Sequence, residues 1–222
     1  SDLTDEDLIP EEDLIVTLSK EGYAKTQPLD AYQAQNRGGT GKRAASLKDE
    51  DFVSKLFVAN THDTFLCFSS YGKVYWIKVY RLPRGGRNAK GRPIVNLLPL
   101  EKDERIQAVL PVKEFNDDQF IFMATESGSV KKTKLSAYSR PMKSGIKAIK
   151  LREGDRVVNA EITDGSKEIM LFSNSGKSIR FKETDARPIG RVSQAVRGMR
   201  IEKHQRIIQR HKNKHKSQRT KK

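Results

Sequence analysis

The stretch FLCFSSYGKVYWIKV, residues 65–79, indicates the fold class of this chain. β-Branched and aromatic residues lie on both sides of a short polar turn that contains Gly72. Glycine supplies the positive φ that tight hairpin turns require, and helical periodicity is absent from the stretch. The stretch therefore predicts two antiparallel β-strands joined by a tight turn.

Three more stretches repeat this pattern, and the turn glycines follow one another at intervals of roughly 50 residues. The stretches are LIVTLSKEGYAKT at 14–26 with Gly22, FIFMATESGSVKKTKL at 120–135 with Gly128, and IMLFSNSGKSIRFK at 169–182 with Gly176. Self-similarity at this period is typical of proteins built from repeated supersecondary units. We therefore expect four hairpin units in the chain.

Each hairpin is followed by a glycine step into another short strand, and then by a polar turn and one more apolar strand. The glycine steps are GGTGKRAASL, AKGRPIVNLL, KSGIKAIKL and VRGMRI, with Gly41, Gly91, Gly145 and Gly198. About four strands per unit is the strand content of a propeller blade. The sequence thus predicts an all-β, propeller-like fold of about four four-stranded blades.

The bulky apolar residues of the hairpins are expected to pack between blades, because repeat units bury their apolar faces against one another. They include Leu18, Phe68, Met123 and Phe172. Cys67 is the single cysteine and lies in an apolar run, which predicts a buried thiol. A disulfide within the chain and a zinc cluster of thiolates are both excluded.

Charge is unevenly distributed along the chain, whose net charge is +15. Residues 1–13 hold seven acidic residues and no basic one, whereas residues 203–222 hold nine Lys or Arg and no acidic one. We interpret 1–13 as an acidic linker, 14–202 as the folded domain and 203–222 as a basic, disordered tail. The folded part keeps a large positive excess, which predicts a polyanionic partner such as nucleic acid.

Several function classes find no support in the residues. No apolar run approaches the roughly 20 residues of a membrane-spanning helix, and the acidic start does not resemble a secretory signal, so we expect a cytoplasmic protein without membrane contact. His62 has no partner at a metal-binding spacing, and the acidic residues lie mainly in turns. Neither a metal site nor a catalytic constellation is predicted.

The segment YQAQNRGGTGKRAA, residues 32–45, combines glycines and cations in a way that suits phosphate binding. Its glycines let the backbone approach a ligand closely, and Arg37, Lys42 and Arg43 can pair with phosphate oxygens. A nucleotide-binding loop is not predicted, because Asn36 replaces its first glycine and Arg43 replaces its Ser or Thr.

Within this segment QNRGGTG resembles the gyrase A box, the signature of the C-terminal domain of the bacterial DNA gyrase A protein. It comprises Gln35, Asn36, Arg37, Gly38, Gly39, Thr40 and Gly41. Two positions depart from the signature, because Asn36 and Thr40 stand where the family has basic residues. The resemblance continues through LFVANTHDTFLCFSSYGKVY, GRPIVNLLPLEKDERI and MLFSNSGKSIRFKE, and it covers roughly residues 9–201.

This resemblance implies a β-pinwheel, a propeller-like spiral whose basic rim bends duplex DNA, with the box closing the wrap. The family's domain has six blades, whereas four units are recognisable here. The implied partners are duplex DNA, the remainder of gyrase A, and gyrase B, in an A2B2 heterotetramer. The DNA-cleaving tyrosine and the sites for ATP and Mg belong to other parts of that enzyme. We therefore expect this chain by itself to have neither enzymatic activity nor a cofactor.

Basic residues recur after the turn glycines and around the glycine steps in successive units. Every second residue of a strand shares a face, so Lys132 should lie beside Lys134, and Arg180 beside Lys182. We expect a track that contacts phosphates with little sequence specificity. The predicted rim comprises Lys42, Arg43, Lys73, Lys78, Arg84, Arg87, Lys90, Arg92, Lys131, Lys132, Lys134, Lys143, Lys147, Lys177, Arg180 and Lys182.

Two alternatives stay open at this point. Within the family, the C-terminal domain of the topoisomerase IV C protein has a degenerate box and steers substrates without supercoiling, but the near-intact box favours gyrase. In a different class, a propeller can serve as a protein-interaction platform for which contacts with DNA are incidental. Bending of a short duplex by the chain would distinguish the first class from the second.

Overall fold

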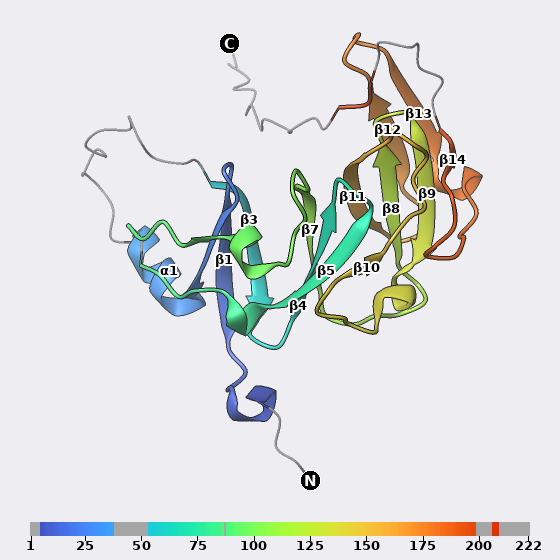
Figure 1. Cartoon of the computed structure of the whole chain (residues 1–222). Coiled ribbons are helices and arrows are strands. Elements are labelled where there is room, and N and C mark those ends of the chain that lie inside the picture. Colours follow the sequence, from blue (N-terminus) through green and yellow to red (C-terminus); the bar gives the residue numbers. More distant parts are fainter. Residues whose placement is uncertain (1–4, 38–52, 87, 199–205, 209–222) are drawn as a thin grey trace, which may run out of the picture.

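The computed structural model describes residues 5–37, 53–86, 88–198 and 206–208, and these form a predominantly β structure (Figure 1). The first two units contain β1 (Asp13–Ser19), β2 (Tyr23–Pro28) and β3 (Val53–Asn60), then β4 (Thr64–Ser69), β5 (Lys73–Lys78), β6 (Arg92–Pro93) and β7 (Ile106–Val112). The last two contain β8 (Phe120–Thr125), β9 (Ser129–Lys134), β10 (Ile146–Lys147) and β11 (Val157–Thr163), then β12 (Glu168–Phe172), β13 (Ser178–Lys182) and β14 (Val196–Arg197).

All four predicted hairpins are confirmed as antiparallel pairs, namely β1–β2, β4–β5, β8–β9 and β12–β13. Their turn glycines have the positive φ that the hairpin pattern requires. The values are 87° at Gly22, 76° at Gly72, 87° at Gly128 and 84° at Gly176.

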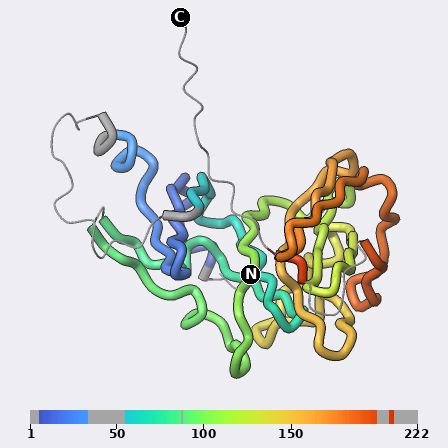
Figure 2. Tube along the Cα trace, turned by 90° about the horizontal axis from the view of Figure 1, so that it is seen from above, coloured from blue at the N-terminus to red at the C-terminus, as the bar shows by residue number. Residues whose placement is uncertain are grey.

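The strands assemble into antiparallel sheets, which we call blades 1 to 4 in chain order. Blade 1 has the strand order β3-β1-β2-β6, blade 2 β10-β5-β4-β7, blade 3 β11-β8-β9-β14 and blade 4 β12-β13. Seen from above, the blades follow one another in chain order (Figure 2). The prediction of an all-β fold with four hairpin units is confirmed, and the described residues complete four strands in blades 1 to 3.

The connectivity differs from the expectation of four consecutive strands per blade. The short strand of each four-stranded blade comes from the next unit, since β6 pairs with β2, β10 with β5 and β14 with β9. Strand order within a sheet depends on pairing across distant parts of the chain, which the repeat pattern alone does not specify. Successive blades are therefore linked by an exchanged strand.

The glycine steps mark where the exchanged strand crosses the preceding hairpin. A Cβ atom at Gly91 would lie 2.3 Å from the carbonyl oxygen of Ala24, and one at Gly145 would lie 2.5 Å from Cε1 of Tyr75. Both glycines also have positive φ, 84° and 71°. Only glycine fits such a close approach without strain.

Gly198 does not occupy the same position as these two glycines, contrary to the predicted period. The amide of Gly198 donates to the carbonyl of Gly128, just as the amides of Ile94 and Ala148 donate to those of Gly22 and Gly72. Each of these amides lies three residues after the crossing position. Ala195 is therefore the residue that corresponds to the crossing glycines in the fourth unit.

A matched pair of glycine substitutions tests this account of the crossing. Gly145→Ala should lower the free energy of unfolding by about 3 kcal/mol, because it adds a clash with the buried ring of Tyr75 to the strain of positive φ. Gly22→Ala meets no atom within 4 Å and should cost only about 1 kcal/mol. Urea denaturation measures both, and equal costs would contradict a steric role for the crossing.

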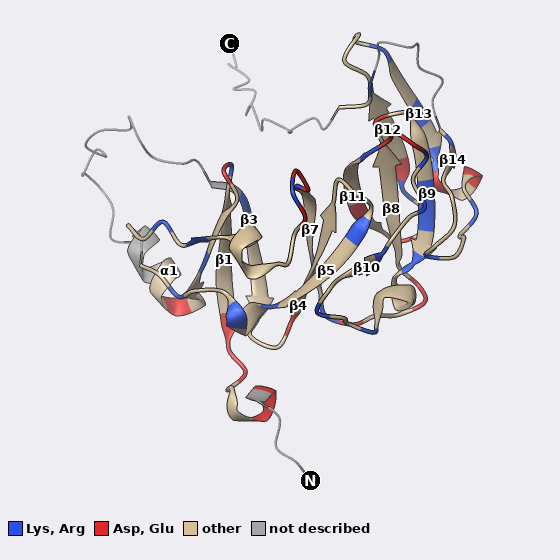
Figure 3. Ribbon diagram, viewed as in Figure 1, with Lys and Arg blue, Asp and Glu red and all other residues tan. Residues whose placement is uncertain are grey.

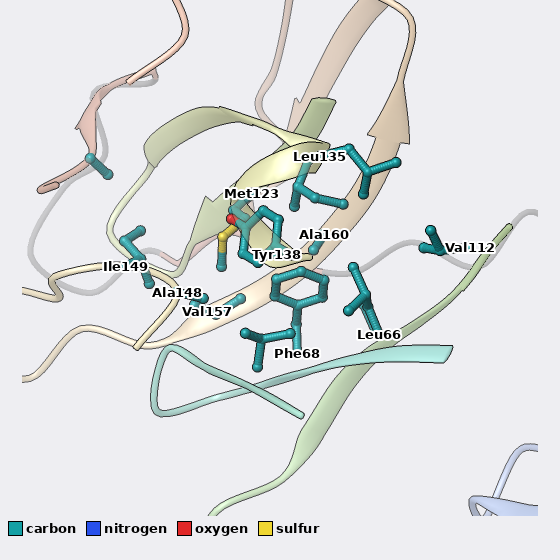
Figure 4. Packing of buried hydrophobic residues seen from close by; sticks show 14 residues of the cluster. Leu66, Phe68, Val112, Met123, Leu135, Tyr138, Ala148, Ile149, Val157 and Ala160 are labelled. Carbon is teal, nitrogen blue, oxygen red and sulfur yellow. The ribbon is translucent and has the colours of Figure 1, made fainter. Parts of the chain in front are cut away.

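Three apolar clusters lie between successive blades. The cluster between blades 1 and 2 contains Cys67, which is buried as predicted, and burial raises the pKa of its thiol to about 12. In the cluster between blades 2 and 3, the rings of Phe68 and Tyr138 meet edge to face with centroids 5.6 Å apart (Figure 4). Of the predicted core residues Phe68 and Met123 are buried, whereas Leu18 and Phe172 are only partly buried.

A helical segment follows the second strand of every hairpin, at the seventh residue after the turn glycine. These segments are α1 (Leu29–Arg37), η2 (Val79–Arg81), η4 (Leu135–Tyr138) and η5 (Glu183–Asp185). Two other helical turns are η1 (Asp5–Leu8) and η3 (Ile94–Leu97). The first residue of η2 and η4 is a buried aliphatic one, whereas η5 begins with a buried glutamate. No helix in the described part of the chain is long and apolar enough to cross a membrane.

Candidate nucleic-acid interface

The two edges of each complete blade face different surroundings. β7 of blade 2 and β11 of blade 3 are edge strands that contact each other across the two blades, and they lie side by side in Figure 1. The exchanged strands β6, β10 and β14 form the opposite edges. The β7 and β11 edges thus meet. We call the edges formed by β3, β7 and β11 the inner edge, and those formed by the exchanged strands the peripheral edge.

Each exchanged strand carries an exposed cation at this peripheral edge. The cations are Arg92 on β6, Lys147 on β10 and Arg197 on β14. Lys147 and Arg197 are equivalent, because each pairs with the residue that follows a turn glycine, Lys73 and Ser129 respectively. Arg92 is one position out of this register, because it pairs with Ala24, whereas Pro93 pairs with the residue after Gly22. Three successive blades therefore each carry an exposed cation on the exchanged strand, and the cations of blades 2 and 3 occupy equivalent positions.

Two residues of the predicted rim, Lys131 and Lys132, are not on the surface, and that part of the prediction is wrong. Their exposed fractions are 1% and 5%. The prediction assumed that one face of β9 meets solvent, as in a sheet with a single covered face. Blade 3 is covered on both faces, because Lys131 lies toward blade 2 and Lys132 toward blade 4.

Lys132 forms a buried ion pair across the junction of blades 3 and 4. Its Nζ lies 3.3 Å from Oε2 of Glu183, which is fully buried, and 4.5 Å from the ring centre of Phe120. Glu183 also accepts hydrogen bonds from the hydroxyl of Thr163, at 2.6 Å, and from the amide of Lys167, at 3.0 Å. The pair is consequently part of the structure and not available to DNA.

Lys131 binds carbonyls at the crossing between blades 2 and 3. Its Nζ donates to the carbonyl of Ala148, at 2.7 Å, and to that of Arg191. Burial, and to a smaller extent the charge of Arg191, lowers the pKa of Lys131 to about 8 from 10.5. In this environment the charged form is less favourable than in water.

The lowered pKa of Lys131 has a consequence for stability. Between about pH 8 and pH 10.5 the unfolded chain binds more protons at this lysine than the folded chain does. The free energy of unfolding should therefore rise with pH in this window, relative to that of Lys131→Met. Urea denaturation across the window measures the difference. Lys134→Met, at the exposed end of the same strand, should keep the wild-type rise, and a flat difference for Lys131→Met would contradict the assignment.

Five further rim residues are paired with acidic side chains. Lys78 contacts Glu6 at 3.0 Å and Arg84 contacts Glu12 at 2.6 Å. The remaining pairs are Lys73–Glu101 at 3.9 Å, Lys90–Glu21 at 3.6 Å and Arg180–Glu168 at 3.1 Å. DNA phosphates would have to compete with these carboxylates.

The other described rim residues are exposed, namely Arg92, Lys134, Lys143, Lys147, Lys177 and Lys182. Arg180 and Lys182 share the outer face of blade 4, as predicted. Arg87, Lys42 and Arg43 lie outside the described residues. The predicted rim left out other exposed cations, among them Lys150, Arg152, Arg156 and Arg197. Arg197 could have been found from its place beside a glycine step.

The box is only partly described. Gln35, Asn36 and Arg37 form the end of α1, which contacts β1 and β2 of blade 1, so the box begins on a helix. Gly38, Gly39, Thr40 and Gly41 lie outside the described residues. Arg37 is the last residue of α1.

No metal-binding group emerges from the residues that the structure describes, since they contain no cluster of three or more His, Cys, Asp and Glu able to hold an ion. The candidate interface consists instead of exposed cations on the exchanged strands, at the peripheral edge of the blades.

Comparison with known proteins identifies the family to which this repeated structure belongs. The sequence model of a family described as "DNA gyrase C-terminal domain, beta-propeller" matches residues 13–60, 63–113, 119–164 and 167–209. The chain belongs to this family. Each match begins with a hairpin. Each of the last three also contains the short strand that pairs with the sheet of the preceding blade.

Relatives of this DNA gyrase C-terminal domain are gyrase A proteins. The chain is 62% identical over 184 residues to the DNA gyrase A protein of Aeromonas salmonicida, and 53% identical over 208 residues to that of Escherichia coli (strain K12). These matches cover 83% and 94% of the chain but only 20% and 24% of the relatives. The chain thus spans about a quarter or less of the proteins it matches.

Solved structures show the same fold. The crystal structure of the C-terminal domain of DNA topoisomerase IV has a TM-score of 0.77 at 30% identity, covering 90% of this chain and 61% of that one. The structure of the DNA gyrase A C-terminal domain has a TM-score of 0.60 at 27% identity, covering 89% and 64%. These matches support the predicted β-pinwheel. The C-terminal domains of topoisomerase IV and of gyrase A share this fold, so the fold does not distinguish between them. More than half of the aligned residues are identical to those of gyrase A proteins, and this favours gyrase over topoisomerase IV.

Proposed function

We propose that this chain binds duplex DNA along its peripheral edge and wraps it, as the C-terminal part of a gyrase A protein. The observation that carries this proposal is the recurrence of Arg92, Lys147 and Arg197 on three successive exchanged strands. Cations at one edge of stacked blades can follow a phosphate backbone through a bend. Contacts of this kind carry no direct sequence information, so binding should be nearly independent of sequence.

In this proposal the rest of the enzyme supplies the chemistry. The remainder of gyrase A would provide the DNA-cleaving tyrosine and the dimer contacts, and gyrase B would bind ATP with Mg, in an A2B2 heterotetramer. The chain by itself would have no cofactor and no enzymatic activity, and it would work on the chromosome in a bacterial cytoplasm. Its similarity to gyrase A proteins supports this assignment.

A wrapping assay tests the proposal. Relaxed circular DNA is incubated with the chain, treated with a nicking-closing topoisomerase, deproteinised and examined for a change in linking number. A change that grows with protein concentration is the expected result, because a chiral wrap stores superhelical turns. Binding without bending of a short duplex would favour the protein-interaction platform instead.

The box should matter more for wrapping than for binding. Arg37→Ala combined with Lys42→Ala removes two cations of the box segment and leaves the peripheral edge intact. We expect the linking-number change to fall several-fold, while affinity for a short duplex falls less than about tenfold, as expected for loss of one or two phosphate contacts. Topology and gel-shift assays run in parallel measure both, and an equal loss would contradict a special role for the box.

A further inference from the structure

The acidic segment before β1, drawn in red below β1 in Figure 3, forms ion pairs with two cations of the predicted rim. Oε1 of Glu6 lies 3.0 Å from Nζ of Lys78, and Oε2 of Glu12 lies 2.6 Å from Nη2 of Arg84. Lys78 ends β5, and Arg84 lies on the connection between β5 and β6. Two acids from the start of the chain thus neutralise two residues of the predicted DNA-binding rim.

Backbone contacts hold this segment in place independently of the ion pairs. The hydroxyl of Thr61 donates to the carbonyl of Pro10 at 2.9 Å, and the amide of Thr61 donates to the carbonyl of Glu12 at 2.9 Å. Nε2 of His62 lies 2.7 Å from the carbonyl oxygen of Ile9. The segment should therefore stay in place when the carboxylates of Glu6 and Glu12 are neutralised.

The ion pairs themselves are accessible to exchange. The side chains of Lys78 and Glu6 are each 34% exposed, and those of Arg84 and Glu12 are 56% and 34% exposed. Exposed pairs contribute about 1 kcal/mol or less, because water and salt screen them. A closely spaced row of phosphates can therefore compete with the carboxylates. A cation that stays paired with its carboxylate neutralises no phosphate and releases none of the counterions that are condensed on the DNA.

We propose that Glu6 and Glu12 compete with DNA phosphates for Lys78 and Arg84 and so moderate the affinity of the wrap. This inference rests on the proposed function, because it concerns the regulation of the same surface. The acidic segment acts as an internal polyanion that keeps binding weaker and less dependent on salt than the cations alone would make it.

The test compares two double variants that change the net charge equally. Glu6→Gln with Glu12→Gln removes both carboxylates from the cations, while Lys78 keeps its hydrogen bond to the carbonyl oxygen of His62 at 3.2 Å. Glu153→Gln with Glu161→Gln neutralises two exposed acids for which the described residues show no ion pair. The first variant should bind a short duplex about tenfold more tightly at 0.1 M salt, with a log–log salt slope steeper by about 1.8. The second should leave the slope unchanged and alter affinity less than about threefold, as long-range charge alone would do.

Substitution of the two cations distinguishes a loss of ion pairing from an indirect effect on folding. Lys78→Gln with Arg84→Gln should flatten the salt slope by about 1.8 in the Glu6→Gln, Glu12→Gln background, and much less in the wild-type background. Thermal melting of each variant checks that the fold is intact. Equal slopes for the two acid-neutralising variants would overturn the competition while leaving the proposed function untouched. Absence of DNA binding by the wild type and by every variant would overturn the proposed function and this inference together.

Discussion

Lys132→Met is expected to lower the free energy of unfolding by about 3–5 kcal/mol, because it leaves the fully buried carboxylate of Glu183 without its cation. Three neighbouring donors remain, from Thr163, Gly165 and Lys167, but they cannot replace a positive charge. Urea denaturation with tryptophan fluorescence measures the loss, since Trp76 lies in the neighbouring cluster.

A second substitution shows whether the missing cation is the cause. Glu183→Gln added to Lys132→Met removes the uncompensated charge and keeps an oxygen that can accept hydrogen bonds. The double variant should regain at least half of the lost stability, and the two substitutions should be coupled by about 2 kcal/mol. Additive losses would mean that Lys132 and Glu183 stabilise the junction of blades 3 and 4 separately. The exposed pair Arg180–Glu168 is the control, and breaking it should cost less than about 1 kcal/mol.

Removing the three cations of the exchanged strands should give the largest loss of DNA binding. The variant Arg92→Ala, Lys147→Ala, Arg197→Ala deletes one phosphate contact from each of three blades. The slope of log affinity against log salt should flatten by about 2.7, and affinity near 0.1 M salt should fall on the order of a hundredfold. Fluorescence anisotropy with a short duplex over a salt series measures both quantities.

The matched control removes the same charge on or near the inner edge, which β3, β7 and β11 form. Lys55 lies on β3, Lys113 directly follows β7, and Lys167 lies between β11 and β12. Replacing these three residues with alanine should leave the slope within about one unit of the wild type, because general charge loss acts over a distance that salt screens. If both triple variants lose affinity equally, DNA does not follow the peripheral edge.

Much of the fold could be predicted because local signals determine it. The hairpins follow from apolar runs around a turn glycine, and four such runs indicate four blades. Strand exchange could not be predicted, since it concerns which unit supplies the last strand of a sheet. The misplacement of Gly198 has the same origin, because only the hydrogen bond to Gly128 reveals that Ala195 holds the equivalent position.

The candidate surface was predicted less well than the fold. Alternation along β9 predicted only that Lys132 and Lys134 share a face, and the rim was expected to include both Lys131 and Lys132. In a stack of blades, however, both faces of an inner sheet are covered. A lysine at either position is then buried and must find partners within the protein. Conversely, Arg197 was overlooked although it stands directly before Gly198 in a recognised glycine step, and its position on the edge strand β14 exposes it.

The exchanged strands also affect how stability is shared along the chain. Blade 1 extends from Asp13 to Pro93, blade 2 from Thr64 to Lys147 and blade 3 from Phe120 to Arg197, so consecutive blades overlap in sequence. Opening one hairpin therefore withdraws a strand from the blade before it, and local unfolding spreads to a neighbour. No single blade can be excised as an autonomous module at a repeat boundary. During synthesis, each blade can close only after the following hairpin has left the ribosome.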